Sequence, residues 1–163
     1  MNNIILCGFM GAGKTVVGKE LAKIMGCRFI DTDEMIEREQ GVAIKAIFAT
    51  RGEEHFRKLE HELCKRIGEM KNCVVSTGGG AMTYDSNVEA VKKSGKIVFL
   101  DASFETICSR IGENAARPLF KDKEQAKELY NERREKYLAA ADIVVDGDMS
   151  ARKAALTVAA MFK

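Results

Sequence analysis

The sequence predicts a single α/β domain, a three-layer sandwich in which a five-stranded parallel sheet lies between two layers of helices. The chain has 163 residues, which fits one domain. Short runs rich in Val and Ile alternate with longer amphipathic stretches, as in successive β-α-β units. Most of the short runs also lack the polar–apolar alternation of a half-exposed strand, so both faces of the sheet are expected to be covered.

Each element can be placed from this pattern. The five predicted strands are the apolar runs 3–7, 28–31, 73–77, 96–101 and 142–146. Helices are predicted between and after them at 14–25, 103–111, 124–140 and 151–162.

Two stretches interrupt the alternation. Residues 33–70 form a long insert predicted to hold two helices, since apolar residues recur at steps of three and four from Phe56 to Met70. Residues 112–122 are polar and include Arg117 and the only proline, Pro118. Inserts in such folds carry substrate sites or lids, so both stretches are expected to be functional.

Composition excludes several classes of protein. Apolar residues make up 46% and charged residues 31%, which excludes a disordered chain. The net charge is only +2, and no apolar run approaches the ~20 residues of a membrane span, so no nucleic-acid or membrane partner is expected. The five cysteines include no C-x-x-C pair, which favours buried thiols in a reducing cytoplasm. No stripe of exposed apolar residues is apparent, and a monomer is expected.

The most specific motif is a phosphate-binding loop. Residues 8–15 read GFMGAGKT and fit the pattern G-x-x-x-x-G-K-[ST], after a predicted strand and before a predicted helix. Glycines allow consecutive backbone N–H groups to point at a phosphate, and the helix N-terminus adds partial positive charge. Lys14 is expected to reach the β- and γ-phosphates of a nucleotide, and the Thr15 hydroxyl to ligate Mg²⁺. The small size and the lack of an N-K-x-D motif favour a small-molecule kinase over a switch protein.

Carboxylates for metal binding or proton transfer are expected at strand ends. Asp31 and Asp33 follow the second strand, and residues i and i+2 of an extended segment share a face. One of them is expected to hold hydrated Mg²⁺ and the other to accept a hydroxyl proton. A plain acidic cap on a helix starting near Glu34 is the structural alternative. Asp101, at the end of the fourth strand, is a second candidate for the metal, although an N-cap role there is ordinary.

Arginines and a glycine-rich turn are candidates for anion binding. Gly78, Gly79 and Gly80 follow the third strand and would let a ligand approach the backbone closely. Arg57 is predicted near a helix start, where a cation is mildly unfavourable, which suggests a purpose beyond folding. Arg133 and Arg134 are adjacent and about 100° apart on a helix, so at most one of them is expected to face a site.

Together these motifs resemble the shikimate kinase family over nearly the whole chain. The P-loop is shared by many enzymes, but the order of the other motifs is far more specific. The resemblance rests on GFMGAGKT at 8–15, DTD at 31–33, Ile44, Phe48, Gly52-Glu53, Phe56-Arg57, Glu60, the three glycines 78–80, Arg110, Arg117-Pro118-Leu119, Arg133, Tyr137 and Ala141-Asp142.

The resemblance implies a nucleoside-monophosphate-kinase-like fold with sheet order 2-3-1-4-5. It also implies transfer of the γ-phosphate of ATP to the 3-hydroxyl of shikimate, with Mg²⁺. The substrate-binding insert would cover about 33–61 and the lid about 112–122 of a domain spanning 1–163. The implied catalytic residues are Lys14, Asp33 and Arg117, and the implied metal ligands are Thr15 and, through water, Asp31. ATP would be bound by Gly11, Ala12, Gly13, Lys14, Thr15, Val16, Arg110 and Arg117. Shikimate would be bound by Asp33, Arg57, Gly79, Gly80, Arg133, Phe48 and Phe56.

The sequence departs from the family pattern at two positions. Val16 replaces a second Ser or Thr after the P-loop Thr, which should not remove the metal ligand. Glu135 stands where the family often has Pro, which leaves open whether Arg133 or Arg134 faces the site. Another small P-loop kinase, acting on gluconate or a nucleotide, is the alternative enzyme. A non-catalytic nucleotide-dependent regulatory module is the alternative outside enzymes, although such a module has no need of a base.

Overall fold

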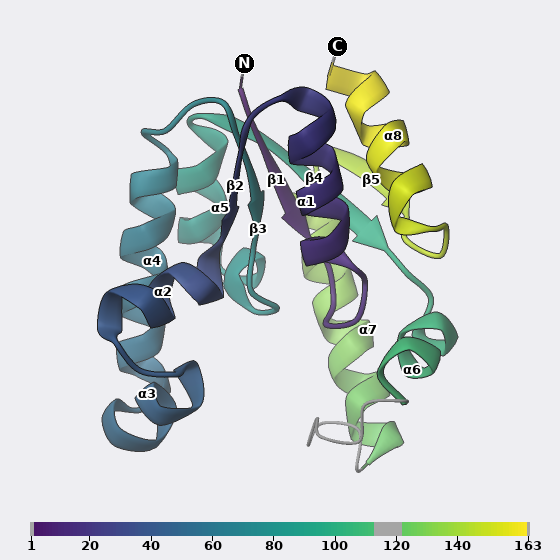
Figure 1. The fold of residues 1–163 in the computed structure, drawn as a ribbon. Helices are drawn as coiled ribbons and strands as arrows, with labels where there is room; N and C mark the ends of the chain where they lie inside the picture. The colour runs from purple at the N-terminus through teal and green to yellow at the C-terminus, as the bar shows by residue number, and fades with distance from the viewer. Residues whose placement is uncertain (1, 113–121, 163) are drawn as a thin grey trace.

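The computed structural model describes residues 2–112 and 122–162 and confirms the predicted α/β fold. Five parallel strands form one sheet in the order β2-β3-β1-β4-β5 (Figure 1). The central strand pairs with its neighbours so that Ile5 lies opposite Val75 on one side and Ile97 on the other. The strands are β1 (Asn3–Cys7), β2 (Arg28–Asp31), β3 (Cys73–Ser76), β4 (Gly95–Asp101) and β5 (Ile143–Asp146).

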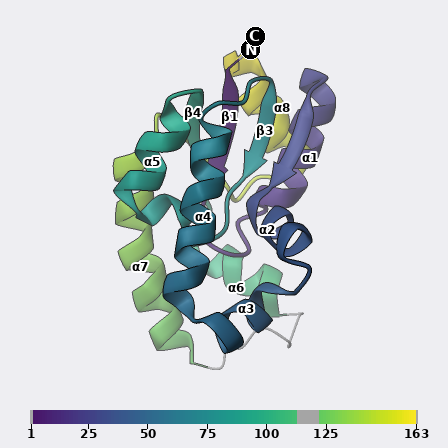
Figure 2. The ribbon, with the colours of Figure 1, turned by 90° about the vertical axis from the view of Figure 1, so that its left-hand side faces the viewer.

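Helices cover both faces of the sheet. On one face α1 packs against α8, and on the other face lie α5 and α7 (Figures 1 and 2). β1 is buried along its whole length, as its lack of alternation predicts. The helices are α1 (Lys14–Met25), α2 (Thr32–Gln40), α3 (Ile44–Arg51), α4 (Glu53–Ile67), α5 (Asp85–Lys92), α6 (Phe104–Gly112), α7 (Lys123–Ala140) and α8 (Ala151–Phe162), with a short 3₁₀ turn η1 (Ala81–Thr83).

The structure corrects two predictions about elements. The insert after β2 holds three helices, because Gly41 and Gly52, both with positive φ, end α2 and α3. The 3₁₀ turn η1 and the helix α5 were not predicted at all. They follow directly on three glycines and are short, and α5 begins with the polar residues Asp-Ser-Asn, so the sequence there gives no extended helical apolar pattern.

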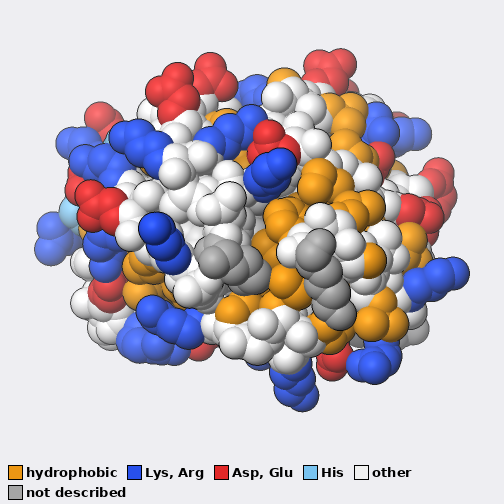
Figure 3. Space-filling view, turned by 90° about the horizontal axis from the view of Figure 1, so that it is seen from above, with side chains coloured by type: hydrophobic (Ala, Val, Ile, Leu, Met, Phe, Trp, Pro, Cys, Tyr) orange, Lys and Arg blue, Asp and Glu red, His pale blue; other side chains and the backbone are white. Residues whose placement is uncertain are grey.

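The two ends of the molecule differ. At the carboxyl ends of the strands, α2 and α3 project on one side and α6 and the start of α7 on the other (Figure 1). The opposite end carries both termini, and there Lys and Arg side chains are interspersed with Asp and Glu around apolar side chains (Figure 3). Among the described helices, none combines the length and apolar character that a membrane crossing requires.

Candidate active site

The P-loop joins β1 to α1 at the carboxyl edge of the sheet. Gly13 has a φ of 91° and begins α1 without any side-chain cap, which leaves backbone N–H groups at the helix start open to a ligand. The Lys14 ammonium donates a hydrogen bond to the carbonyl of Gly8 within the loop. The Thr15 hydroxyl lies 3.2 Å from Oδ2 of Asp31, so the loop and the end of β2 meet.

A cleft of about 670 Å³ opens beside the P-loop. It is lined by the loop, by the end of β2 and by the segment that follows β3, three parts of the chain that the parallel sheet brings to one edge. The predicted site residues that line it are Gly11, Gly13, Lys14, Thr15, Val16, Asp31, Asp33, Gly79 and Arg110. Ala12 lies in the same loop and is buried.

Asp31 and Asp33 both reach the cleft, but not in the way predicted. Asp31 ends β2 and caps α2, because its Oδ1 accepts a hydrogen bond of 3.1 Å from the Glu34 N–H. Asp33 lies in the first turn of α2, so the two residues do not share the face of an extended segment. Asp31 therefore caps α2 through one oxygen while its other oxygen faces Thr15, and Asp33 has no capping contact among the described residues.

Three side chains converge on the glycine turn (Gly78, Gly79 and Gly80). A Cβ built on Gly78 would lie 2.5 Å from Oδ1 of Asp33, and one on Gly80 would lie 2.8 Å from Nη1 of Arg57. A Cβ on Gly79 would lie 3.1 Å from Nη1 of Arg133. A side chain at Gly78 or Gly80 would therefore displace the neighbouring carboxylate or guanidinium group from its observed position. These approaches also place one acid and two guanidinium groups around a single turn.

The structure separates Arg133 from Arg134. Arg133 faces the site, with its guanidinium carbon 5.9 Å from the ring centroid of Phe9 in the P-loop. Arg134 turns to the fourth strand and makes a bidentate ion pair with Asp101, at 3.0 Å from Nε to Oδ1 and 2.8 Å from Nη2 to Oδ2. Both oxygens of Asp101 are thus held by Arg134, which disfavours the alternative of Asp101 as a metal ligand.

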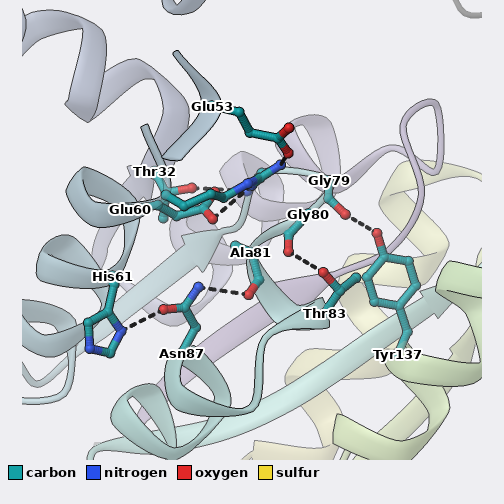
Figure 4. Close-up of polar contacts among 12 residues, drawn as sticks. Thr32, Glu53, Glu60, His61, Gly79, Gly80, Ala81, Thr83, Asn87 and Tyr137 are labelled. Atoms are coloured by element: carbon teal, nitrogen blue, oxygen red, sulfur yellow. Dashed lines mark hydrogen bonds and ion pairs between the residues drawn. The ribbon is translucent and has the colours of Figure 1, made fainter. Parts of the chain in front are cut away.

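Arg57 is held in place by acids of its own helix. Its Nη1 lies 2.9 Å from Oε1 of Glu60, which is 1% exposed, and its Nη2 lies 3.6 Å from Oε1 of Glu53 (Figure 4). Arg57 lies in the second turn of α4 rather than at its start, so the predicted conflict with the helix dipole does not exist. Its buried Nε has no hydrogen-bond partner among the described residues.

Phe48 and Phe56 form an aromatic pair, and Phe56 contacts Arg57. The Phe48 and Phe56 rings lie 4.9 Å apart, and the Arg57 guanidinium lies 5.3 Å from the Phe56 ring. Phe56 is buried, whereas Phe48 is 37% exposed.

Burial shifts the pKa values of two charged groups in the cleft. It lowers the pKa of Lys14 to about 8, because an ammonium loses hydration inside the loop. Burial also raises the pKa of Asp33, and the neighbouring Asp31 carboxylate raises it further. A carboxyl with a raised pKa next to a cleft is a candidate for proton transfer near neutral pH.

Arg110 closes the other side of the P-loop. It donates hydrogen bonds of 3.1 Å to the carbonyl of Ala12 and 2.9 Å to that of Gly147. It also lines a cavity of about 340 Å³ between the loop and α8, whose other walls include Val16 and Met149. Arg117 and the predicted lid at 112–122 lie almost wholly outside the described residues, which leave out 113–121.

Sequence reasoning assigned no role to three further residues of the site. Glu60 is the buried partner of Arg57, the Thr32 hydroxyl accepts a 2.9 Å hydrogen bond from the Gly78 N–H, and the Tyr137 hydroxyl donates to the carbonyl of Gly79 (Figure 4). The spacing of Arg57 and Glu60 by three residues in a helix could have indicated their ion pair. The contacts of Thr32 and Tyr137 span 46 and 58 residues and have no local signal.

Comparisons with known proteins point to one family. A protein-family model described as shikimate kinase matches residues 10–162. A shikimate kinase of Persephonella marina is 46% identical over 144 residues, which cover 88% of this chain and 87% of the relative. The solved structure of shikimate kinase from Acinetobacter baumannii in complex with shikimate superposes with a TM-score of 0.91 at 34% identity, over 99% of this chain and 93% of that one.

A structure from the alternative enzyme class is also similar. A gluconokinase from Sinorhizobium meliloti covers 99% of this chain and has a TM-score of 0.60, but its identity is 16%. That similarity shows a shared fold and nothing more. The family model and the relative of higher identity decide the question, and the chain belongs to the shikimate kinase family.

Proposed function

We propose that this protein transfers the γ-phosphate of ATP to the 3-hydroxyl of shikimate, giving shikimate 3-phosphate and ADP. The observation that carries the proposal is the convergence of Asp33, Arg57 and Arg133 on the glycine turn, whose Gly78 and Gly79 line the same cleft as Asp33 and the P-loop. Shikimate has one carboxylate and three hydroxyls. The arrangement offers two guanidinium groups to bind the carboxylate and one carboxylate to bind the hydroxyls.

The two arginines would bind the acceptor through its carboxylate. A guanidinium presents parallel N–H donors that match a carboxylate in two points, so a pair of them fixes the plane of a small ring. Glu60 and Glu53 hold Arg57 in place before the acceptor arrives, which lowers the entropic cost of binding. Phe48 and Phe56 would pack against the ring carbons, and the Gly79 and Gly80 backbone would lie against the acceptor.

Asp33 would act on the reacting hydroxyl. As the bond from the hydroxyl oxygen to the γ-phosphorus forms and the bond from that phosphorus to the β,γ-bridging oxygen breaks, the hydroxyl proton passes to the Asp33 carboxylate. Its raised pKa makes it a better acceptor for that proton than an exposed carboxylate. A carboxylate in this position also selects for hydroxyl groups by hydrogen bonding.

The P-loop would hold the triphosphate through the backbone N–H groups of Gly11, Ala12 and Gly13 and the Lys14 ammonium. Arg110 and Val16 are proposed to line the base pocket beside the loop. Arg117 is proposed to neutralise charge on the phosphoryl group from the lid, a role that stays a prediction because its position lies outside the described residues.

The donor set beside Lys14 suits Mg²⁺. A Thr15 hydroxyl 3.2 Å from an Asp31 carboxylate oxygen offers the hard oxygen ligands that Mg²⁺ prefers. We propose that Thr15 ligates the ion directly and Asp31 holds one of its waters, the remaining ligands being water and phosphate. When bound, the ion would neutralise charge on the β- and γ-phosphate oxygens.

Removing the Thr15 hydroxyl should raise the Mg²⁺ requirement. In Thr15→Val the Mg²⁺ concentration for half-maximal rate is expected to rise roughly 10-fold or more, because changes in metal-site partners commonly cost this much affinity. The measurement is a Mg²⁺ titration of the initial rate at fixed ATP and shikimate. Thr15→Ser keeps the hydroxyl and should behave like the wild type; equal Mg²⁺ requirements in the Val and Ser variants would remove Thr15 from the metal site.

Nucleotide binding should weaken as pH rises through 8. The free protein loses the Lys14 charge above a pKa of about 8, whereas bound phosphates favour the charged form and raise that pKa again. The ADP dissociation constant is therefore expected to rise roughly 10-fold from pH 7.5 to 9. Calorimetry at both pH values measures it. Lys14→Met should bind ADP weakly with little change between them, and a flat wild-type affinity would contradict the prediction.

The proposed function itself is tested with a panel of acceptors. ADP release is measured with ATP and Mg²⁺ in the presence of shikimate, quinate, gluconate or a nucleoside monophosphate, and NMR locates the phosphate in the product. Release that depends on shikimate and a product phosphorylated at O3 would support the proposal. Dependence on gluconate or a nucleotide would favour another kinase, and ATP binding without acceptor-dependent release would favour a regulatory module.

Three broader features belong to the same proposal. The chain would be one kinase domain spanning 1–163 with its acceptor-binding insert at about 33–61, which includes α3 and its Phe48, and a lid at about 112–122. It would act as a monomer. A cytoplasmic location is supported by the five cysteines, all of which carry free thiols as expected in a reducing compartment.

A further inference from the structure

The backbone of the glycine turn is held by hydrogen bonds at every carbonyl. The Gly78 carbonyl accepts from the Ala81 N–H at 3.1 Å, and the Gly80 carbonyl accepts from the Thr83 hydroxyl at 2.6 Å (Figure 4). The Gly79 carbonyl accepts from the Tyr137 hydroxyl. The Gly78 N–H donates a hydrogen bond to the Thr32 hydroxyl.

Two backbone N–H donors of the glycine turn take no part in these hydrogen bonds. Within the described part of the chain, the N–H groups of Gly79 and Gly80 have no acceptor. Partly buried donors of this kind need a partner from a ligand or from water. They lie beside the two arginines that approach Gly79 and Gly80, so the turn and the guanidinium groups form one donor surface.

Tyr137 is the member of this network that comes from furthest away. The contacts of Gly78 and Gly80 with Ala81 and Thr83 are local, whereas Tyr137 lies on α7 and reaches a turn 58 residues earlier. Its side chain is 1% exposed and its ring lies 5.3 Å from that of Phe99 on β4. A buried ring in a packed position has little rotational freedom, so its hydroxyl is a fixed point for the turn.

Arg133 lies one helical turn before Tyr137 on α7. The Arg133 guanidinium approaches Gly79, the same residue whose carbonyl accepts the hydrogen bond from the Tyr137 hydroxyl. Two side chains one turn apart on α7 therefore meet the glycine turn at the same residue, Tyr137 through its hydroxyl and Arg133 through its guanidinium group. Burial raises the pKa of Tyr137 above its ordinary value, so the phenol keeps its proton across neutral pH and stays a donor.

We propose that Tyr137 is a positioning residue for the acceptor: its hydroxyl sets the distance between the Arg133 guanidinium and the Gly79–Gly80 backbone, and through it the affinity for the acceptor's carboxylate. This inference rests on the proposed function. It assigns Tyr137 no contact with the phosphates and no part in proton transfer. Its loss should therefore weaken acceptor binding while leaving nucleotide binding intact.

The chain offers a matched control on the same helix. Tyr130 lies seven residues before Tyr137, and its hydroxyl donates a 2.7 Å hydrogen bond to the backbone carbonyl of Ala102, away from the glycine turn. Tyr137→Phe and Tyr130→Phe each remove one hydroxyl and keep the ring. Both lose a comparable hydrogen bond to a carbonyl, so a general effect on stability would appear in both variants.

The experiment measures kcat and the KM values for shikimate and ATP in the wild type and the two variants. Tyr137→Phe is expected to raise the shikimate KM roughly 10-fold, with the ATP KM and kcat within about 3-fold of the wild type. Tyr130→Phe should change none of them beyond about 2-fold. In an Arg133→Met background, Tyr137→Phe should have little further effect on the shikimate KM, because the two changes act on one interaction.

The outcomes separate the inference from the function on which it rests. An unchanged shikimate KM in Tyr137→Phe, equal rises in both KM values, or the same rise in Tyr130→Phe would each overturn the positioning role while leaving shikimate phosphorylation in place. Additive effects of the Tyr137 and Arg133 changes would overturn it too. A wild type that phosphorylates no shikimate would overturn the proposed function first, and this inference with it.

Discussion

Replacing Asp33 with Asn is expected to lower kcat at least 100-fold. The amide has almost the same shape as the carboxylate, so it fits against Gly78, where a Cβ would lie only 2.5 Å from the Asp33 oxygen. It lacks the basicity to accept the proton of the attacking hydroxyl, and a positioned base commonly contributes 10²–10⁴-fold to a rate. Asp31, not Asp33, caps α2, so the change should leave the helix start intact.

The measurement is kcat at saturating ATP and shikimate, with Asp101→Asn as the control. Asp101 also ends a strand, but both of its oxygens are engaged by Arg134 outside the cleft. Its substitution should change kcat by less than about 3-fold, since Asp101 does not line the cleft and holds none of the side chains proposed to act on the substrates. Wild-type turnover in Asp33→Asn would remove that residue from the mechanism, and a large loss in Asp101→Asn would restore the alternative metal ligand.

Replacing Arg57 with Lys is expected to raise the shikimate KM roughly 10- to 100-fold with a smaller effect on kcat. Lysine keeps the positive charge beside the buried Glu60, so no acid is left without a partner. The substitution removes the planar guanidinium group, whose parallel N–H donors can bind both oxygens of a carboxylate. Losing one such charge-assisted hydrogen bond costs about 1.5–3 kcal/mol of binding free energy. The loss should appear in acceptor binding because Arg57 lies against the glycine turn and not against the P-loop.

Arg134→Lys is the matched control for this prediction. It removes the guanidinium fork that pairs with both oxygens of Asp101, at a position outside the acceptor site. The KM values for shikimate and ATP should remain within about 2-fold of the wild type, as expected for a partly exposed ion pair. An unchanged shikimate KM in Arg57→Lys, or an equal rise in Arg134→Lys, would contradict the assignment of Arg57 to the acceptor's carboxylate.

The sequence was sufficient for the fold because its strongest signals are local. The uninterrupted apolar run of β1, followed by Gly13 and Lys14, specifies a buried strand, a phosphate loop and a helix within 25 residues. The same approach failed where the signal is short. The eight residues of α5 contain a single turn of apolar positions, and the glycine that separates α3 from α4 looks no different from one inside a loop.

The residues of the site could be predicted from the sequence, but the contacts between them could not. The motif series identified Asp33, Arg57 and Arg133, and the structure brings them together. The choice between Arg133 and Arg134 depended on Asp101, which lies 33 residues from Arg134 and attracts it to the other side of α7. Likewise nothing near Tyr137 in the sequence indicates a bond to Gly79, because such contacts arise only when the sheet and α7 pack together.

The anchoring of the glycine turn has a consequence for altering acceptor preference by directed evolution. A segment whose carbonyls are tied to three separate partners tolerates few changes, so random libraries spread over residues 77–81 should yield mostly inactive clones. Phe48 is different, because it is 37% exposed, lies in a short helix and makes no hydrogen bond through its side chain. Under the proposed function, variation at Phe48 would change the apolar surface that packs against the acceptor ring and would leave the arginines proposed to bind its carboxylate unchanged.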